Sequence, residues 1–225
     1  MTPHILLINP NSSETTSDMM QAIALRSSAE RLDVKAVTAS RSPAMIVTPE
    51  QLTASATQVV ELGTAHGRDC AGIIVSAFGD PGLAELRRKV AVPVVGICEA
   101  SMIEASQGGQ KFGVATSTPD LIEAIDQRAH DLGLGHLYTG VRCTEGDPVA
   151  LASDTGLLAE ALAGAVRACI ELDGAEAVII GGGPLGQAAD RLRQVFDTPV
   201  IGPIPAAVER LIGLIGQGTS VPQAM

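Results

Sequence analysis

The chain has 225 residues, of which 46% are hydrophobic, so it can bury the core of one large domain or of two smaller lobes. Its formal net charge is −10, and it contains no Trp, one Tyr and three Phe. This charge repels polyanions, and few rings are available to stack on bases or to anchor at a membrane interface. We therefore expect no nucleic-acid or membrane partner.

The N-terminus does not resemble an export signal, because the apolar run at residues 5–8 is short and no cationic region precedes it. We therefore expect a cytoplasmic protein. The scattered histidines give no metal-site spacing, and no apolar run approaches the ~20 residues of a membrane-spanning helix. No CxxC pair occurs, so four free thiols are expected: Cys70, Cys98, Cys143 and Cys169.

Short apolar runs alternate with helical patterns along the whole chain. Eight runs that end in Gly, Pro, Ser or Asn predict strands at residues 4–8, 32–37, 72–75, 92–96, 111–115, 140–143, 175–180 and 199–202. The segments between them predict helices at residues 12–27, 49–66, 83–90, 119–132, 155–173, 187–196 and 204–215. This alternation predicts an α/β fold with mainly parallel sheets flanked by helices, in which ligands bind beyond the carboxyl ends of the strands.

The second half of the chain repeats the first at a period of about 105 residues. Segments 73–96 and 178–202 share an apolar strand, a polar or glycine-rich turn, a helix with a Leu-Arg pair, and a strand that begins Pro-Val. The repeat aligns Ala77 with Gly182. It predicts two pseudo-symmetric lobes with an active-site cleft between them: residues 1–105 plus 205–225, and residues 106–204.

Four runs resemble successive motifs of hydantoin and allantoin racemases, and the chain is similar to the aspartate/glutamate/hydantoin racemase superfamily over nearly its whole length. The runs are LLINPNSS at 6–13, FGDPGL at 78–83, PVVGI with Glu99 at 93–99, and FGVAT at 112–116. The resemblance implies a two-lobed fold, no cofactor, self-association into a homo-oligomer, and one cysteine from each lobe that together exchange the α-proton of a small substrate. It places those cysteines at Ala77 and Gly182, neither of which can accept a proton, so a two-thiol racemase is excluded.

The resemblance leaves an anion-binding half of the site, which would hold a carboxylate, imide or enolate. Its residues would be Asn9, Asn11, Ser12, Thr116, Ser117, Gly181, Gly182 and Gly183. Candidate replacements for the missing acid and base are Ser76, Asp80, Cys98 and Glu99, near the ends of strands in the first lobe. Each candidate also has a structural interpretation, as a turn or cap residue, a small apolar residue, or a member of an ion pair.

A glycine-rich run at residues 181–186 fits the G-x-G-x-x-G pattern of dinucleotide sites. Only one further strand follows it, Pro184 removes an amide donor, and Asp197 comes too early to bind a ribose. We therefore expect no dinucleotide cofactor.

Three functional hypotheses follow from the sequence. The first is a cofactor-independent isomerase or racemase that acts on a small carboxylate, hydantoin or cyclic amide with an altered acid/base apparatus. The second is a lyase or hydrolase that cleaves a C–C or C–N bond in the same anion-binding cleft. The third is a non-catalytic small-molecule binding protein, which a cleft without ionisable side chains would favour.

Overall fold

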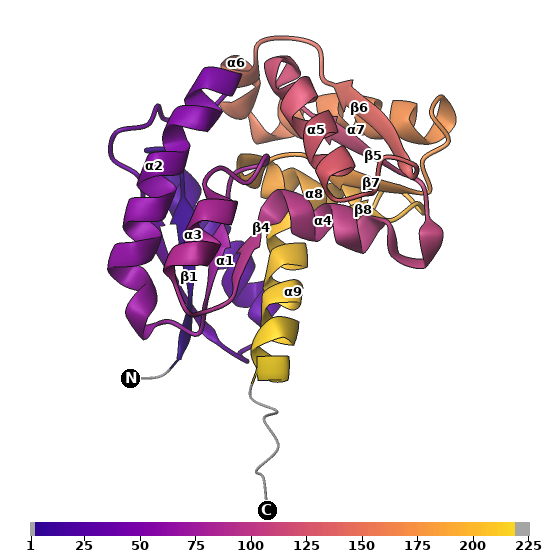
Figure 1. Cartoon of the computed structure of the whole chain (residues 1–225). Helices are drawn as coiled ribbons and strands as arrows, with labels where there is room; N and C mark the ends of the chain where they lie inside the picture. Colours follow the sequence, from indigo (N-terminus) through magenta and orange to yellow (C-terminus); the bar gives the residue numbers. More distant parts are fainter. Residues whose placement is uncertain (1–2, 219–225) are drawn as a thin grey trace, which may run out of the picture.

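Two parallel four-stranded sheets form the centre of the computed structural model, which describes residues 3–218 (Figure 1). The first sheet has the order β2-β1-β3-β4, and the second has the equivalent order β6-β5-β7-β8. Their strands are β1 (His4–Asn9), β2 (Asp33–Thr38), β3 (Gly72–Val75), β4 (Val94–Gly96), β5 (Phe112–Thr116), β6 (Tyr138–Cys143), β7 (Ala177–Ile180) and β8 (Val200–Ile201). The predicted α/β class, the eight strands and the two lobes are confirmed.

Helices connect the strands and cover both sheets. They are α1 (Glu14–Ser28), α2 (Pro49–His66), α3 (Leu83–Lys89), α4 (Ile97–Ala105), α5 (Ile122–Asp131), α6 (Pro148–Ala152), α7 (Thr155–Glu171), α8 (Gly186–Leu192) and α9 (Pro203–Gly218). Local signals start several of them. The side chain of Ser13 caps α1, Thr48 and Gln51 form a capping box at α2, and Asp154 caps α7.

The helix that follows each sheet in the chain packs on the other sheet. Helix α4 follows the first sheet and contacts β7 and β8 of the second. Helix α9 follows the second sheet and contacts β3 and β4 of the first, together with α1 and α4. In Figure 1, α9 runs beside the first lobe while α4 lies beneath the second. The exact lobe boundaries at residues 105 and 204 stay predictions.

Helices α4 and α6 were not predicted from the sequence. Helix α4 has no apolar stripe to reveal it, because seven of its nine residues are buried between the lobes. Its N-cap residue, Gly96, also offers no capping side chain. Helix α6 is only five residues long, too short for a periodic pattern.

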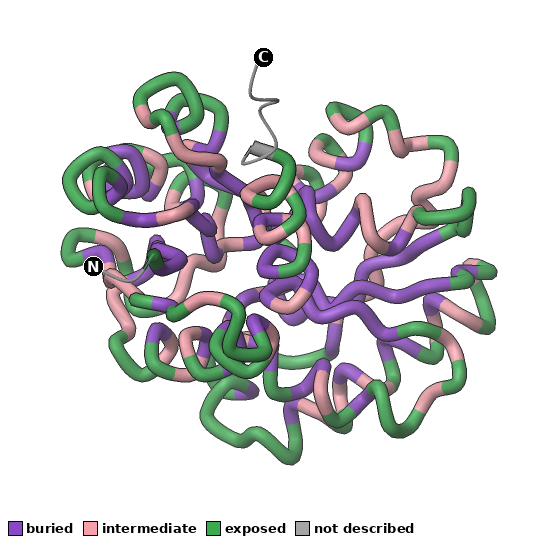
Figure 2. Tube along the Cα trace, turned by 90° about the horizontal axis from the view of Figure 1, so that it is seen from below, coloured by how far each residue is buried: buried purple, intermediate pink, exposed green. Residues whose placement is uncertain are grey.

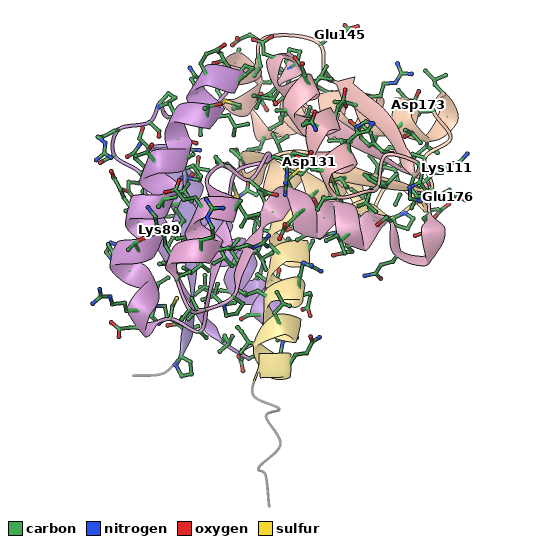
Figure 3. The ribbon with its side chains drawn as sticks, in the orientation of Figure 1. Lys89, Lys111, Asp131, Glu145, Asp173 and Glu176 are labelled. Carbon is green, nitrogen blue, oxygen red and sulfur yellow. The ribbon has the colours of Figure 1, made fainter. Side chains whose placement is uncertain are left out.

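The interior of the fold is mainly apolar, and most charged side chains lie outside, with Asp80 and Glu99 as buried exceptions. Strands β1, β3, β5 and β7 are buried throughout. Figure 2 shows buried stretches of the chain in the interior, with exposed stretches around the outside. Side chains such as Lys111, Glu145 and Glu176 extend from the periphery (Figure 3). Within residues 3–218, no helix combines the length and the apolar character needed to cross a membrane.

Candidate functional site

A cleft opens between the lobes beyond the carboxyl ends of β3, β5 and β7, and it encloses about 550 Å³ including its mouth. This is the edge at which parallel α/β sheets bind ligands. Its lining comes from both lobes: Asn11, Met45, Ile46, Leu52, Ser76, Ala77, Phe78, Thr116, Ser117, Thr118, Leu121, Ile125, Gly181, Gly182, Gly183, Pro184 and Leu185. Eight of the residues predicted for the site are therefore brought together here: Asn11, Ser76, Ala77, Thr116, Ser117, Gly181, Gly182 and Gly183.

Two polar side chains in this lining have a hydrogen-bond donor that is not used within residues 3–218. Ser117 is 1% exposed, and its Oγ has no hydrogen-bond partner among the described residues. A buried hydroxyl without a partner costs free energy that a ligand could recover. Asn11 accepts from the Ser13 N–H at 2.9 Å through Oδ1, which fixes the orientation of its amide. Its Nδ2 has no hydrogen bond within residues 3–218 and is left as a donor at the cleft wall.

Asn9 and Ser12, both predicted to bind substrate, shape the turn beside the cleft instead of lining it. Asn9 Nδ2 donates to Asn11 Oδ1 at 2.8 Å and to Ser17 Oγ at 2.9 Å, while Asn9 Oδ1 accepts from the Asn11 N–H. The N–H of Ser12 donates to the carbonyl of Pro43 at 3.1 Å. These bonds hold Asn11 in place beside the cleft, and substrate binding by Asn9 and Ser12 stays an untested prediction.

Ser76 and Thr116 line the cleft, but both already donate their hydroxyl protons. Ser76 Oγ donates to the Ile8 carbonyl at 2.6 Å, and Thr116 Oγ1 donates to the Gly181 carbonyl at 2.7 Å. Each hydroxyl joins the ends of neighbouring strands in its own lobe. Their remaining capacity toward a ligand is as acceptors.

The glycine-rich turn after β7 allows the two lobes to approach closely. A Cβ on Gly183 would lie 2.8 Å from the main-chain oxygen of Ser76, so only glycine fits at this contact. Gly182 has an extended backbone with φ of 171°, which any residue can adopt. Ala77 and Gly182, where the resemblance places the two thiols, both line the cleft.

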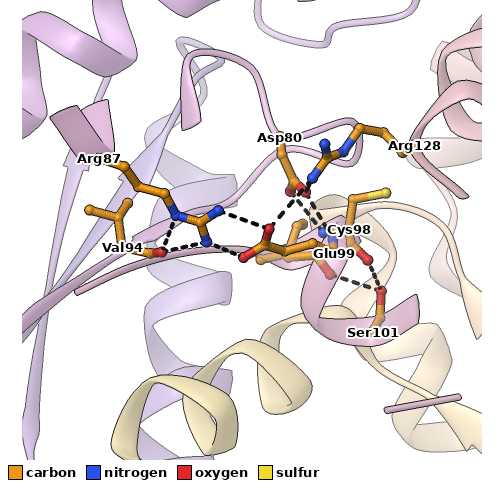
Figure 4. A network of polar contacts seen from close by, with 8 residues as sticks. Asp80, Arg87, Val94, Cys98, Glu99, Ser101 and Arg128 are labelled. Atoms are coloured by element: carbon orange, nitrogen blue, oxygen red, sulfur yellow. Dashed lines mark hydrogen bonds and ion pairs between the residues drawn. The ribbon is translucent and has the colours of Figure 1, made fainter. Parts of the chain in front are cut away.

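Asp80, Cys98 and Glu99, predicted as candidate acid/base residues, lie outside the cleft lining at the start of α4 (Figure 4). Asp80 accepts from the N–H groups of Cys98 at 2.9 Å and Glu99 at 2.8 Å, so it caps the helix. Burial raises the pKa of the Cys98 thiol well above its usual range, which keeps the thiol protonated at neutral pH. Glu99 pairs with Arg87. Their structural interpretations match these contacts, whereas their catalytic roles stay untested predictions.

The apolar wall of the cleft was not predicted from the sequence. Met45, Ile46 and Leu52 line it from the segment after β2, and Leu121 and Ile125 line it from the second lobe. The side chain of Gln58 fixes the first segment, because its Oε1 accepts from the N–H groups of Ser40 at 3.0 Å and Arg41 at 2.8 Å. The short apolar run Ala44–Val47 was the signal available in the sequence.

None of the residues that line the cleft carries an ionisable side chain. Burial raises the pKa of Cys143, the least buried of the cysteines, and it too lies outside the lining. No group of His, Cys, Asp and Glu residues suited to a metal ion occurs within the described part of the chain. The cleft thus offers hydroxyl and amide groups beside an apolar wall.

Comparison with known proteins gives one consistent family. The model described as Asp/Glu/Hydantoin racemase matches residues 5–211. A hydantoin racemase from Rhizobium meliloti is 29% identical over 218 residues, which cover 96% of this chain and 90% of the relative. The solved allantoin racemase from Klebsiella pneumoniae has a TM-score of 0.91 at 25% identity and covers 100% of this chain and 95% of its own. Unliganded arylmalonate decarboxylase shares the fold, with a TM-score of 0.65 at 20% identity over 99% of this chain and 97% of its own.

Proposed function

The chain belongs to the Asp/Glu/Hydantoin racemase family, and we propose that its cleft binds a small hydantoin, cyclic amide or carboxylate without exchanging a proton through side chains. One observation carries this proposal: no side chain in the cleft lining is ionisable. Proton abstraction from a carbon needs a base within hydrogen-bond reach, and alanine or glycine cannot serve. The best-supported function is therefore ligand binding by a family member that has lost the two-thiol reaction.

The lining also selects the charge of the ligand. A free amino acid would bring an ammonium group into a cleft whose lining has no carboxylate to pair with it. Burying an unpaired charge is costly, and the net charge of −10 repels anions at long range. A neutral cyclic amide or hydantoin fits best, with its polar edge at Asn11 and Ser117 and an apolar substituent against Met45 and Ile46.

A second function, C–C bond cleavage, is favoured by the unpartnered Ser117 hydroxyl. Loss of CO2 from a malonate-type acid leaves its electron pair in an enolate, which needs a hydrogen-bond donor and then a proton from solvent. No basic side chain takes part in that step. The arylmalonate decarboxylase likeness supports only that this fold can host such a reaction.

The deciding experiment combines calorimetry with proton NMR in D2O on the purified protein. The panel would contain 5-methylhydantoin, 5-benzylhydantoin, allantoin, glutamate and phenylmalonate. We expect 5-benzylhydantoin to bind more tightly than 5-methylhydantoin, glutamate not to bind, and no ligand to exchange its α-proton. Protein-dependent deuterium incorporation would overturn the proposal in favour of a racemase with another base, and phenylacetate formed from phenylmalonate would establish the lyase.

A further inference from the structure

Asp80 connects three parts of the molecule although it lies outside the cleft lining. Its N–H donates to the Ala77 carbonyl at 3.0 Å, which closes the turn that carries Ala77 and Phe78 into the cleft. Its carboxylate caps α4 through the N–H groups of Cys98 and Glu99. Asp80 adopts a positive φ of 53°, and Gly96 leaves room for the carboxylate, since a Cβ there would lie 2.2 Å from Asp80 Oδ1.

The third contact of Asp80 crosses between the lobes. Arg128 of α5 reaches over from the second lobe, and its Nη2 lies 3.1 Å from Asp80 Oδ2 and 3.5 Å from Glu99 Oε2. The Asp80 side chain is fully buried and that of Arg128 is 23% exposed, so solvent screens this pair only weakly. Figure 4 shows the guanidinium of Arg128 above the two carboxylates, with Arg87 on the far side of Glu99.

Both members of this ion pair adjoin walls of the cleft. Phe78 precedes Asp80 by two residues and lines the cleft from the first lobe. Ile125 precedes Arg128 by three residues, on the same face of α5, and lines the cleft from the second lobe. A change in the distance between Asp80 and Arg128 therefore moves the two walls relative to each other.

We propose that Asp80 and Arg128 form a clamp that sets the width of the cleft, with Asp80 as a positioning residue that acts through the turn at Ala77 and through α5. Removing Arg128 leaves the buried Asp80 carboxylate without its counter-ion, and removing Asp80 leaves Arg128 with only the more distant Glu99. Either change weakens the link between α5 and the first lobe. This proposal does not depend on which ligand the cleft binds, so it is independent of the proposed function.

Pulsed electron paramagnetic resonance on the ligand-free protein tests the clamp directly. Spin labels at Thr57→Cys on α2 and Glu123→Cys on α5 occupy exposed positions on opposite lobes, and Cys143→Ser removes the native thiol that is not buried. We expect one narrow distance distribution in the labelled parent. Arg128→Gln should shift it to longer distances and broaden it. The matched control Arg142→Gln breaks an ion pair with Asp173 inside the second lobe and should leave the distribution unchanged.

A double variant keeps the test decisive if the single variant does not fold. Asp80→Asn/Arg128→Gln leaves neither charge unpaired and should show the same widening, with a circular dichroism spectrum like that of the parent. Arg128→Lys keeps the positive charge and should return the distribution toward the parent. A parental distribution in the folded double variant or in folded Arg128→Gln would overturn the clamp, whatever the ligand panel shows.

Discussion

Arg87 and Arg193 make the same hydrogen bond in the two lobes. Each donates Nε to the main-chain carbonyl seven residues further along, to Val94 at 3.0 Å and to Val200 at 2.9 Å. The repeat in the sequence thus extends to a side-chain contact that joins a helix to the strand after it. The two arginines differ in their other contacts. Arg87 donates to Val94 a second time, through Nη2 at 2.7 Å, and pairs with the buried carboxylate of Glu99. Arg193 instead pairs with the partly exposed carboxylate of Asp190 at 2.9 Å.

This difference predicts unequal stability losses. Arg193→Met should lower the free energy of unfolding by about 1 kcal/mol, because it removes one hydrogen bond to Val200 and a partly exposed ion pair with Asp190 that adds little. Arg87→Met should lower it by about 2 to 3 kcal/mol, because it also weakens the pairing of a buried carboxylate. Urea unfolding of both variants at pH 7.5 measures the difference. Equal losses of unfolding free energy in the two variants would mean that Arg87 does little to stabilise the buried carboxylate of Glu99.

Asp80 predicts a pH dependence of stability. Burial raises its pKa to about 6, against the opposing effects of Arg128 and the two N–H groups of α4, while the nearby carboxylate of Glu99 raises it further. The carboxyl group therefore contributes stability that is present below its ordinary pKa and is lost as the pH rises through about 6. The stability of the wild type relative to Asp80→Asn should increase between pH 7.5 and pH 5. A decrease over that range in urea titrations would show that Arg128 dominates and that the pKa is lowered.

Restoring the two thiols should restore proton exchange. Gly182 lies in extended backbone, and a Cβ there would meet the Leu185 side chain at 3.1 Å, which requires a shift of only a few tenths of an ångström. Ala77→Cys/Gly182→Cys should incorporate deuterium at C5 of 5-benzylhydantoin at least about 100-fold faster than the wild type. Each single variant, and Ala77→Ser/Gly182→Ala as the matched control, should stay near background. Exchange no faster than background in a folded double variant would argue that these positions do not flank the ligand.

The polar edge of the cleft predicts two binding losses and one neutral change. Ser117→Ala and Asn11→Ala should each weaken binding of 5-benzylhydantoin by roughly 1 to 3 kcal/mol, because each removes one buried polar contact. Ser12→Ala should leave the affinity unchanged, since Ser12 lies outside the lining. Isothermal titration calorimetry at constant pH compares the three. A loss confined to Ser12→Ala would place the ligand on the other side of the turn.

Much of the fold follows from local patterns in the sequence. The buried strands and the amphipathic helices carry their own periodicity, and the repeat between Ala77 and Gly182 predicted the two lobes. Helix α4 was not predicted because the residues around it come from distant parts of the chain. Its cap is Asp80, and its neighbours include β7 and β8. A helix that is buried on all sides and capped by a distant residue has no signature within its own sequence.

Some residues of the candidate site could likewise be predicted from the sequence, and others could not. Thr116 ends β5, Ser117 follows it, and Asn11 lies two residues after β1, so their place at the sheet edge could be predicted from sequence. The roles of Asn9 and Asp80 depend on which hydrogen bonds their side chains make, and a sequence does not show this. Arg128 was missed because its partner lies 48 residues away in the other lobe.

Helix α4 packs on the second sheet and α9 packs on the first, and this arrangement affects how the chain folds. The first sheet lacks the helix that covers β3 and β4 until α9, close to the end of the chain, has been synthesised. The N-terminal half therefore cannot finish folding while the ribosome still makes the C-terminal half, although domains usually fold in order of synthesis. Neither half is an independent cooperative unit, so denaturation should proceed in one transition and a chain cut after α4 should expose apolar surface that invites aggregation.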